Sequence, residues 1–218
     1  MVLSACGGGG GDTSATPTTQ TYAVRTAVGN LRSSTHSWTT VGTGSDGKSY
    51  TIAYASSPLA AGVFALTGAT TGRFQSTVNI KQGTTLVGNG SPIGYYNTTD
   101  YTGLGAAYDD GRCAQATSVT ALPTAAKVGD LGASADVTIY AACSTGSGTS
   151  GFVQSTWSLE ADGGVAFLCS NATVQNTSRV TQATEADCIE IDAAGAIGSP
   201  VRISLAYTGG ITLVTKNY

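Results

Sequence analysis

Apolar and polar residues alternate along most of this 218-residue chain, and short runs of turn-forming residues interrupt the alternation. A period of two is typical of β-strands with one buried face, and we count about ten to twelve such segments. They include residues 21–27, 37–41, 49–55, 73–81, 84–87, 136–143, 151–160, 165–169, 188–192, 201–207 and 211–215. Only in residues 58–66 and 122–128 does the pattern fit a helical turn.

Most of the predicted strands are joined by short Gly-rich or Asp-Gly connections. Because a parallel crossover needs a dozen or more residues, strands joined in this way lie antiparallel beside each other. The predicted fold is therefore all-β, an antiparallel β-meander that forms a sandwich or a barrel. No charge run or proline-rich linker divides the chain after residue 20. We expect a flexible N-terminal tether over residues 1–20 and a single β domain over residues 21–218.

The composition agrees with a β fold and excludes some classes of function. Only 11% of the residues are charged, and the chain is rich in Thr, Ser and Gly, which disfavours a helical bundle with charged outer faces. The 41% of hydrophobic residues are enough to form a core. A formal net charge of -3 gives no basic footprint for nucleic acid, so no nucleic-acid partner is expected.

The cysteines indicate an oxidising compartment. Apart from Cys6, the chain has an even number of them, Cys113, Cys143, Cys169 and Cys188, which allows three pairings. Pairing between sequence neighbours, Cys113 with Cys143 and Cys169 with Cys188, is the simplest prediction. No C-x-x-C spacing occurs, which argues against zinc and against a redox-active dithiol.

Residues Leu3-Ser4-Ala5-Cys6 precede five glycines and a Thr-rich stretch that ends at Gln20. This segment resembles the lipobox and tether of a bacterial lipoprotein. Met1 and Val2 are too few for the charged and apolar regions of a signal peptide, so we expect this sequence to begin late. The resemblance implies that Cys6 is diacylated, that Gly7 directs the protein to the outer membrane, and that the protein belongs with the small β-rich bacterial lipoproteins. Two acyl chains give stable membrane anchoring.

Residues 42–49 read Gly-Thr-Gly-Ser-Asp-Gly-Lys-Ser and match the phosphate-binding P-loop pattern. That motif needs a helix behind it, whereas the alternating, β-branched segment 50–54 follows here. We predict a hairpin turn and no nucleotide.

Other catalytic patterns are weak. The single His, His36, lies in a polar run and is predicted to be an exposed loop residue. The pair Asp109 and Asp110 fits a turn. Trp38 and Trp157 lie in strand-like contexts and are predicted to anchor the core. We therefore expect no catalytic residue, no metal and no cofactor, and a protein that is not an enzyme.

Acidic residues are concentrated between positions 160 and 192. Alternation in the last part of this segment puts Ile189 and Ile191 on one face and Cys188, Glu190 and Asp192 on the other. We interpret the acidic segment as a solvated outer face; a calcium site is the alternative.

Four of the ten tyrosines, Tyr95, Tyr96, Tyr101 and Tyr108, fall among Asn, Asp, Thr and Gly residues in one segment. Such a mixture is typical of adaptable binding surfaces and also suits stacking on sugar rings. The leading hypothesis is a non-catalytic, lipid-anchored binding module at the periplasmic or cell-surface face of the outer membrane, with these tyrosines contacting a carbohydrate or protein ligand. Two alternatives remain: a structural subunit of an extracellular filament or coat, and a calycin-like barrel that binds a small apolar ligand.

Overall fold

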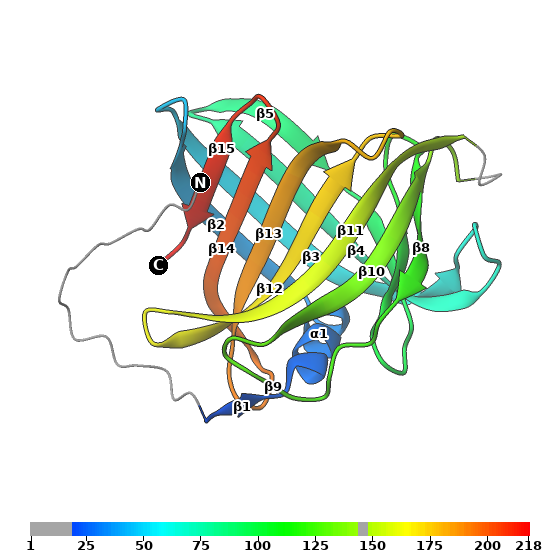
Figure 1. The fold of residues 1–218 in the computed structure, drawn as a ribbon, viewed down its shortest axis with the longest axis horizontal. Coiled ribbons are helices and arrows are strands. Elements are labelled where there is room, and N and C mark those ends of the chain that lie inside the picture. The colour runs from blue at the N-terminus through cyan, green and yellow to red at the C-terminus, as the bar shows by residue number, and fades with distance from the viewer. Residues whose placement is uncertain (1–18, 144–147) are drawn as a thin grey trace.

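The computed structural model describes residues 19–143 and 148–218, in which the chain forms fifteen strands and one helix (Figure 1). The strands are β1 (Thr21–Tyr22), β2 (His36–Gly44), β3 (Ser49–Val63), β4 (Thr70–Gln82), β5 (Thr85–Gly90), β6 (Ile93–Tyr96), β7 (Gly103–Ala107), β8 (Cys113–Val119), β9 (Ala126–Lys127), β10 (Leu131–Tyr140), β11 (Thr149–Asp162), β12 (Val165–Gln175), β13 (Thr181–Ile191), β14 (Ile197–Tyr207) and β15 (Thr212–Lys216). The helix is α1 (Val24–Ser33). The lipobox-like segment, Cys6 and most of the tether lie outside the described residues.

Twelve of the strands close into one antiparallel barrel. They follow the order β3-β2-β15-β14-β13-β12-β11-β10-β8-β7-β6-β4, and β3 pairs with β4 to complete the ring. From β10 to β15 each strand is hydrogen-bonded to the next one along the chain, as a meander requires. The predicted all-β antiparallel class is confirmed, and the barrel is the form that the chain adopts.

Three strands lie outside the ring: β1 and β9 pair with each other as a separate two-stranded sheet, and β5 lies beside the ring at the edge of the large sheet. β5 pairs with the C-terminal part of β4, while β6 pairs with the N-terminal part of the same strand edge. The other edge of β5 has no strand partner among the described residues. Closure therefore removes almost every free edge of the large sheet and leaves this short one.

Strand alternation gives the barrel wall two faces. In β13, Asp187, Ile189 and Ile191 face the interior, while Cys188 and Glu190 point outward. This is the two-faced pattern predicted for residues 188–192.

The segment 21–27 was predicted as a strand, and that prediction is wrong. Only Thr21 and Tyr22 are extended, and α1 begins at Val24. The apolar residues Val24, Ala27 and Leu31 also recur at helical spacing, and the first two are completely buried, so packing of this face stabilises the helix. Neither expected helical turn forms: β3 includes Pro58 and extends to Val63, and residues 122–128 contain only β9.

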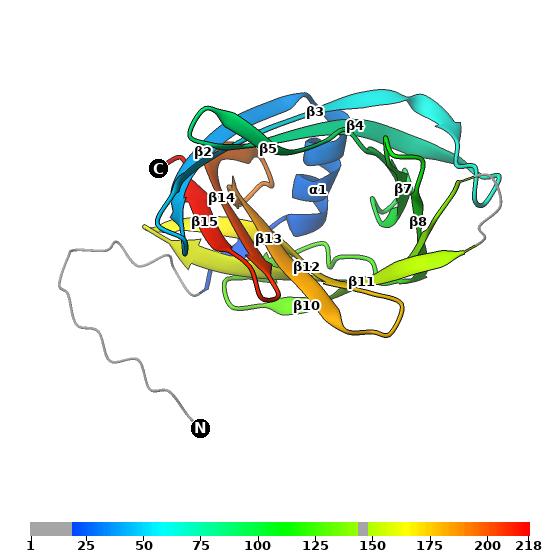
Figure 2. The ribbon, with the colours of Figure 1, turned by 90° about the horizontal axis from the view of Figure 1, so that it is seen from above.

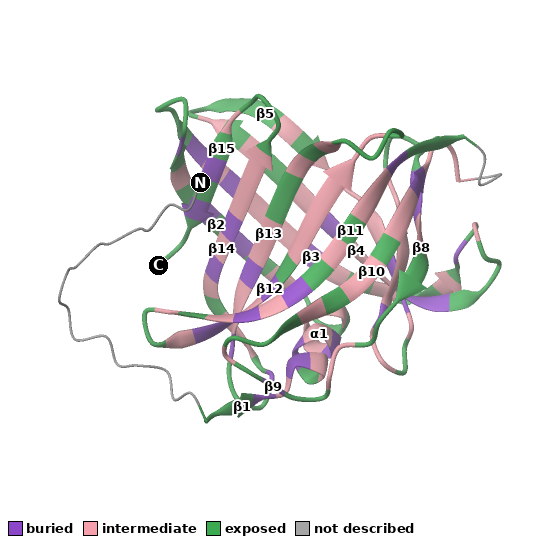
Figure 3. Ribbon diagram, in the orientation of Figure 1, coloured by how far each residue is buried: buried purple, intermediate pink, exposed green. Residues whose placement is uncertain are grey.

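α1 closes one end of the barrel. It lies at the lower end in Figure 1 and within the ring of strands in Figure 2. Its buried face packs on Trp157 and Leu159 of β11 and on Ile191 of β13. A second buried cluster follows β2, β3, β14 and β15, where buried positions are seen along the strands (Figure 3). It includes Trp38, so both tryptophans are buried as predicted. The interior between these two packed regions is the lumen.

The P-loop-like segment is a β-hairpin turn, as predicted. Thr43 of β2 pairs with Ser49 of β3, and Asp46 accepts a hydrogen bond from the Lys48 amide at 3.1 Å. Gly47 adopts a left-handed φ of 76°, a conformation that a glycine allows without strain. The prediction for His36 is wrong: it begins β2, is partly buried, and stacks on Trp38 with ring centroids 5.2 Å apart.

Both predicted disulfides are present. Cys113 is joined to Cys143, and Cys169 is joined to Cys188. Cys169 and Cys188 are directly opposite each other on β12 and β13, so this bridge ties two neighbouring strands. The described residues contain no helix with the length and apolar character that a membrane crossing requires.

Candidate functional site

The lumen contains a cavity of about 290 Å³ between α1 and the barrel wall. Four aromatic side chains border it: Trp38, Tyr54, Phe74 and Trp157. Aliphatic side chains of β12, β13 and β14 complete most of the remaining wall: Leu168, Ile189, Ile191, Val201 and Ile203. We call this space the lumenal cavity. Its lining is mainly apolar because the inward positions of each strand carry the apolar half of the alternating pattern.

Polar groups interrupt this lining at a few positions. Trp157, Ser170, Asp187 and Ile203 are cross-strand neighbours on β11, β12, β13 and β14. On this wall, the Ser170 hydroxyl and the Asp187 carboxyl group therefore lie between the indole ring of Trp157 and the aliphatic side chain of Ile203. Arg32, in the last turn of α1, supplies the cation of the cavity.

The position of Arg32 depends on two reciprocal pairs of glycine and aromatic residues. Gly72 of β4 faces Tyr96 of β6, and Phe74 of β4 faces Gly94 of β6. Each ring lies over the partner glycine, where a Cβ atom would come within 2.4 Å of a ring carbon. The two rings lie beside each other with centroids 6.2 Å apart and planes inclined by 46°. The guanidinium carbon of Arg32 lies 5.8 Å from the Phe74 centroid and 5.4 Å from the Tyr96 centroid.

The guanidinium of Arg32 makes one hydrogen bond among the described residues, a donation to the Tyr101 carbonyl oxygen. Gly29 of α1 leaves room for the Tyr101 ring against the helix, since a Cβ there would lie 2.7 Å from the ring. Burial lowers the pKa of Arg32 to about 10, which still leaves it cationic at neutral pH. Asp100 raises that pKa through its charge, but its Oδ1 accepts hydrogen bonds from the amide and hydroxyl of Thr102 at 3.0 and 2.8 Å. No ion pair joins Arg32 to an acid within the described part of the chain.

On the opposite side, Glu185 and Asp187 form a carboxyl pair on the inner face of β13. Glu185 lies opposite Ala172 and Leu205, so its accessible surface faces the lumen rather than the outside. Burial raises the pKa of both groups. The pKa of Asp187 is raised well above its ordinary value by burial first, then by the charge of Glu185 and by the hydrogen bond between them. The burial of Asp187 and the hydrogen bond between the two groups favour the form in which Asp187 holds a proton and donates it to Glu185.

Tyr54 lies between the cation and the carboxyl pair. Burial raises its pKa, the charge of Asp187 raises it further, and Arg32 and the hydroxyls of Ser56 and Ser76 lower it. Its ring stacks on Trp38, with centroids 5.6 Å apart. The phenol thus lies among the few polar groups of the cavity wall.

The four candidate tyrosines do not share one surface. Tyr95 points outward and is buried against Phe64, with centroids 4.4 Å apart, whereas Tyr96 points inward under Arg32. Tyr101 packs against α1, and Tyr108 lies under Arg112 at 5.4 Å. Their role as ligand contacts stays a prediction; Tyr96 and Tyr101 both contact Arg32, which lines the cavity.

Sequence reasoning missed Arg32, Tyr54 and the carboxyl pair. Glu185 and Asp187 were assigned with the other acidic residues to the outer face, which is wrong for these two. The sequence carried a signal for the inner face, because Glu185 and Asp187 continue the alternation of the inward-facing Ile189 and Ile191. Arg32 had no such signal, since its helix was interpreted as a strand.

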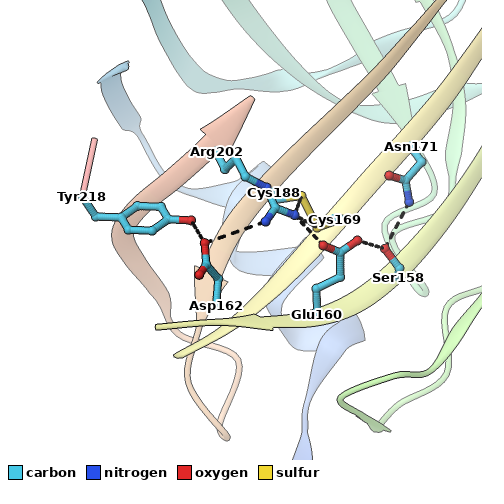
Figure 4. A network of polar contacts seen from close by, with 8 residues as sticks. All are labelled: Ser158, Glu160, Asp162, Cys169, Asn171, Cys188, Arg202 and Tyr218. Carbon is cyan, nitrogen blue, oxygen red and sulfur yellow. Dashed lines mark hydrogen bonds and ion pairs between the residues drawn. A yellow bond between two sulfur atoms is a disulfide. The ribbon is translucent and has the colours of Figure 1, made fainter. Parts of the chain in front are cut away.

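The two acidic residues of β11, Glu160 and Asp162, take part in a network on the outer face (Figure 4). Arg202 forms an ion pair with Glu160 and lies 3.9 Å from Asp162, whose carboxylate accepts a hydrogen bond from Tyr218 at 2.5 Å. The same guanidinium lies 3.3 Å from Cys188 Sγ. The network covers the completely buried Cys169–Cys188 bridge. Glu160 and the two sulfur atoms lie close together, but sulfur atoms joined in a disulfide are not thiolate ligands for a metal ion.

A second hollow, of about 300 Å³, lies over β8, β10, β11 and β12. Polar side chains such as Asp136, Gln154 and Asn171 border it, and no aromatic side chain does so among the described residues. It therefore lacks the stacking surface that suits a sugar ring, and the lumenal cavity is the stronger candidate site.

The chain was compared with protein-family models, with curated proteins and with solved structures, and none of them matches it.

Proposed function

We propose that this protein is a non-catalytic binding protein that holds a small, mainly apolar ligand in the lumenal cavity. The observation that supports this proposal is a cavity of about 290 Å³ that aromatic and aliphatic side chains line, with a few polar groups among them. Small-molecule sites have this composition, because apolar walls supply affinity and single polar groups orient the ligand. A barrel mouth is a common place for such a site.

Two adjacent strands offer a direct test of lumenal binding. Ser170 lines the cavity, whereas Thr184 is exposed on the outer face of β13. Ser170→Phe would fill part of the cavity, and Thr184→Phe adds the same ring outside the barrel. We expect the neutral fluorescent probe N-phenyl-1-naphthylamine to bind the unmodified protein and the Thr184→Phe variant, and to bind the Ser170→Phe variant at least about tenfold more weakly. Equal binding by all three folded proteins, or no binding by any, would contradict the proposal.

The lipobox-like segment supports a location for this activity. Acylation at Cys6 would anchor the barrel to the outer membrane through the tether. The two disulfides agree with an oxidising compartment outside the cytoplasm. A ligand-binding barrel held at a membrane would keep an apolar molecule close to the bilayer.

The filament or coat alternative has one observation in its favour. The free edge of β5 is a place where a strand of another copy could pair, and Leu86 and Val87 on this strand are exposed. Size-exclusion chromatography over a concentration series separates the two functions. A binding protein is expected to elute as one species at all concentrations, whereas assembly through β5 would grow with concentration and be lost in Leu86→Lys.

A further inference from the structure

The charge distribution inside the barrel is asymmetric. Arg32 contributes a fixed positive charge at the α1 end of the lumenal cavity, where Phe74, Tyr96 and Tyr101 surround it. Removing a guanidinium from water is costly unless an acid and further hydrogen bonds compensate it. Among the described residues Arg32 has one carbonyl acceptor and no carboxylate within ion-pair distance.

The carboxyl pair on β13 does not compensate Arg32. Glu185 and Asp187 are not in ion-pair contact with it, and their closest electrostatic partners are each other. Because burial and the charge of Glu185 favour a protonated Asp187, the pair presents less negative charge to the lumen than two separate carboxylates would. A ligand that enters the cavity therefore meets a cation near the closed end and a negative group on a different wall.

Resting on the proposed function, we propose that the natural ligand is a small amphiphile whose single anionic group, of the carboxylate type, pairs with Arg32. Its apolar part lies along Trp38, Trp157 and Ile203, which border the same cavity. A planar guanidinium can donate two parallel hydrogen bonds to a carboxylate, and the low dielectric of the cavity strengthens that pair. The negative charge of the β13 pair keeps the anionic end away from that wall and so fixes the orientation of the ligand.

Three probes with the same tail test the head-group preference: decanoic acid, decanol and decylamine. Each is titrated against the protein at pH 7.5 by displacement of N-phenyl-1-naphthylamine. We expect decanoic acid to bind about tenfold or more tightly than decanol, because a charge-assisted hydrogen bond contributes more than a neutral one. Decylamine is expected to bind more weakly than decanol.

The matched variants are Arg32→Gln and Arg25→Gln. Arg25 is on the same helix but donates to the Leu122 carbonyl at 2.8 Å and does not line the cavity. Arg32→Gln is expected to abolish the preference for the acid over the alcohol, and Arg25→Gln is expected to keep that preference. The melting temperature of ligand-free Arg32→Gln is expected not to fall, since the substitution removes an uncompensated charge.

Several outcomes would overturn the inference. Equal affinity for decanoic acid and decanol would show that Arg32 does not select an anion, although the proposed function would stand. Tightest binding of decylamine would assign the head group to the β13 carboxyl pair. A strong loss of stability in Arg32→Gln with an unchanged preference would make Arg32 a structural residue. Failure of every probe to bind would contradict the proposed function itself.

Discussion

The ring of Tyr218 packs against the ring of Phe167, with centroids 5.3 Å apart and planes inclined by 30°. The Tyr218 hydroxyl also donates to Asp162, which lies beside Arg202. Tyr218 therefore covers the Phe167 ring, which is completely buried although it points away from the lumen. The same tyrosine joins the network over the Cys169–Cys188 bridge (Figure 4). A small buried cluster, Phe167, Cys169 and Cys188, therefore lies on the outer face of β12 and β13, outside the lumen.

Removing this cover is expected to destabilise the barrel. Tyr218→Ala should lower the free energy of unfolding by about 1–2 kcal/mol, because it exposes Phe167 and loses the ring contact. Tyr218→Phe keeps the ring and loses only the hydrogen bond to Asp162, so its cost should be smaller. Urea denaturation at pH 7.5 measures both variants, and an Ala variant as stable as the unmodified protein would contradict the packing role.

The same contact predicts a dependence on alkaline pH. Burial and Asp162 raise the pKa of Tyr218 to about 12 in the folded protein, against an ordinary value of 10.0. A group with a raised folded pKa contributes stability that is complete below the unfolded pKa and is lost as the pH rises through the folded one. Unmodified protein should therefore lose more stability than Tyr218→Phe between pH 10 and pH 12. Parallel denaturation curves at both pH values would refute this expectation.

The carboxyl pair in the lumen should also make stability depend on pH, with a loss of stability as the pH rises above about 4. Asp187 has a folded pKa well above its ordinary value, so its contribution is complete at low pH and is lost as the pH rises through the folded pKa. Asp187→Asn does not titrate, and the variant should gain stability relative to the unmodified protein as the pH rises above about 4, by up to about 1.4 kcal/mol for each pH unit. Denaturation at pH 4, 6 and 8 measures the difference. Thr184→Asn on the outer face is the control and should show no such trend.

The sequence supported the all-β antiparallel class because the alternation is local and strong, and it supported both disulfides because neighbouring strands bring neighbouring cysteines together. It did not choose between sandwich and barrel, since that choice depends on whether β15 meets β2, a contact between strands from opposite ends of the chain. The helix was missed because Tyr22, Val24 and Thr26 also fit a strand. The candidate cavity was missed with it, since Arg32 is placed by that helix and by two glycine–aromatic pairs that no local pattern shows.

Two of the four tyrosines, Tyr95 and Tyr108, offer a test of the hypothesis that these tyrosines bind a ligand. Tyr95 is buried against Phe64, so Tyr95→Ala is expected to cost about 3–5 kcal/mol, as truncation of a large core side chain does. Tyr108→Ala is expected to cost less, since Tyr108 is only partly buried under Arg112. Thermal unfolding of the two variants measures the difference. Equal, small losses would restore Tyr95 as an exposed contact residue.

Inside the barrel, Thr40 and Thr215 are completely buried, and their hydroxyl oxygens lie 2.7 Å apart. Replacement of either one by Val leaves the other hydroxyl with a weaker partner or none, at a cost of about 1–2 kcal/mol. Replacement of both by Val removes the unsatisfied group, so the double variant should lose less than the sum of the two single ones. A double-mutant cycle by urea denaturation measures this coupling. Strict additivity would mean that the two hydroxyls do not depend on each other.

Membrane anchoring through Cys6 can be tested independently of ligand binding in the barrel. Diacylation there would place two lipid chains at the end of the tether, and two chains hold a protein at a bilayer where one does not. In a bacterial host, the protein expressed with a complete signal peptide should incorporate labelled palmitate and sediment with outer membranes. Cys6→Ser should lose the label and appear in the soluble fraction, while its two disulfides and its barrel remain unchanged because Cys6 forms neither bridge. Equal labelling of both proteins, or recovery of the unmodified protein in the cytoplasm with free thiols at Cys169 and Cys188, would contradict the proposed location.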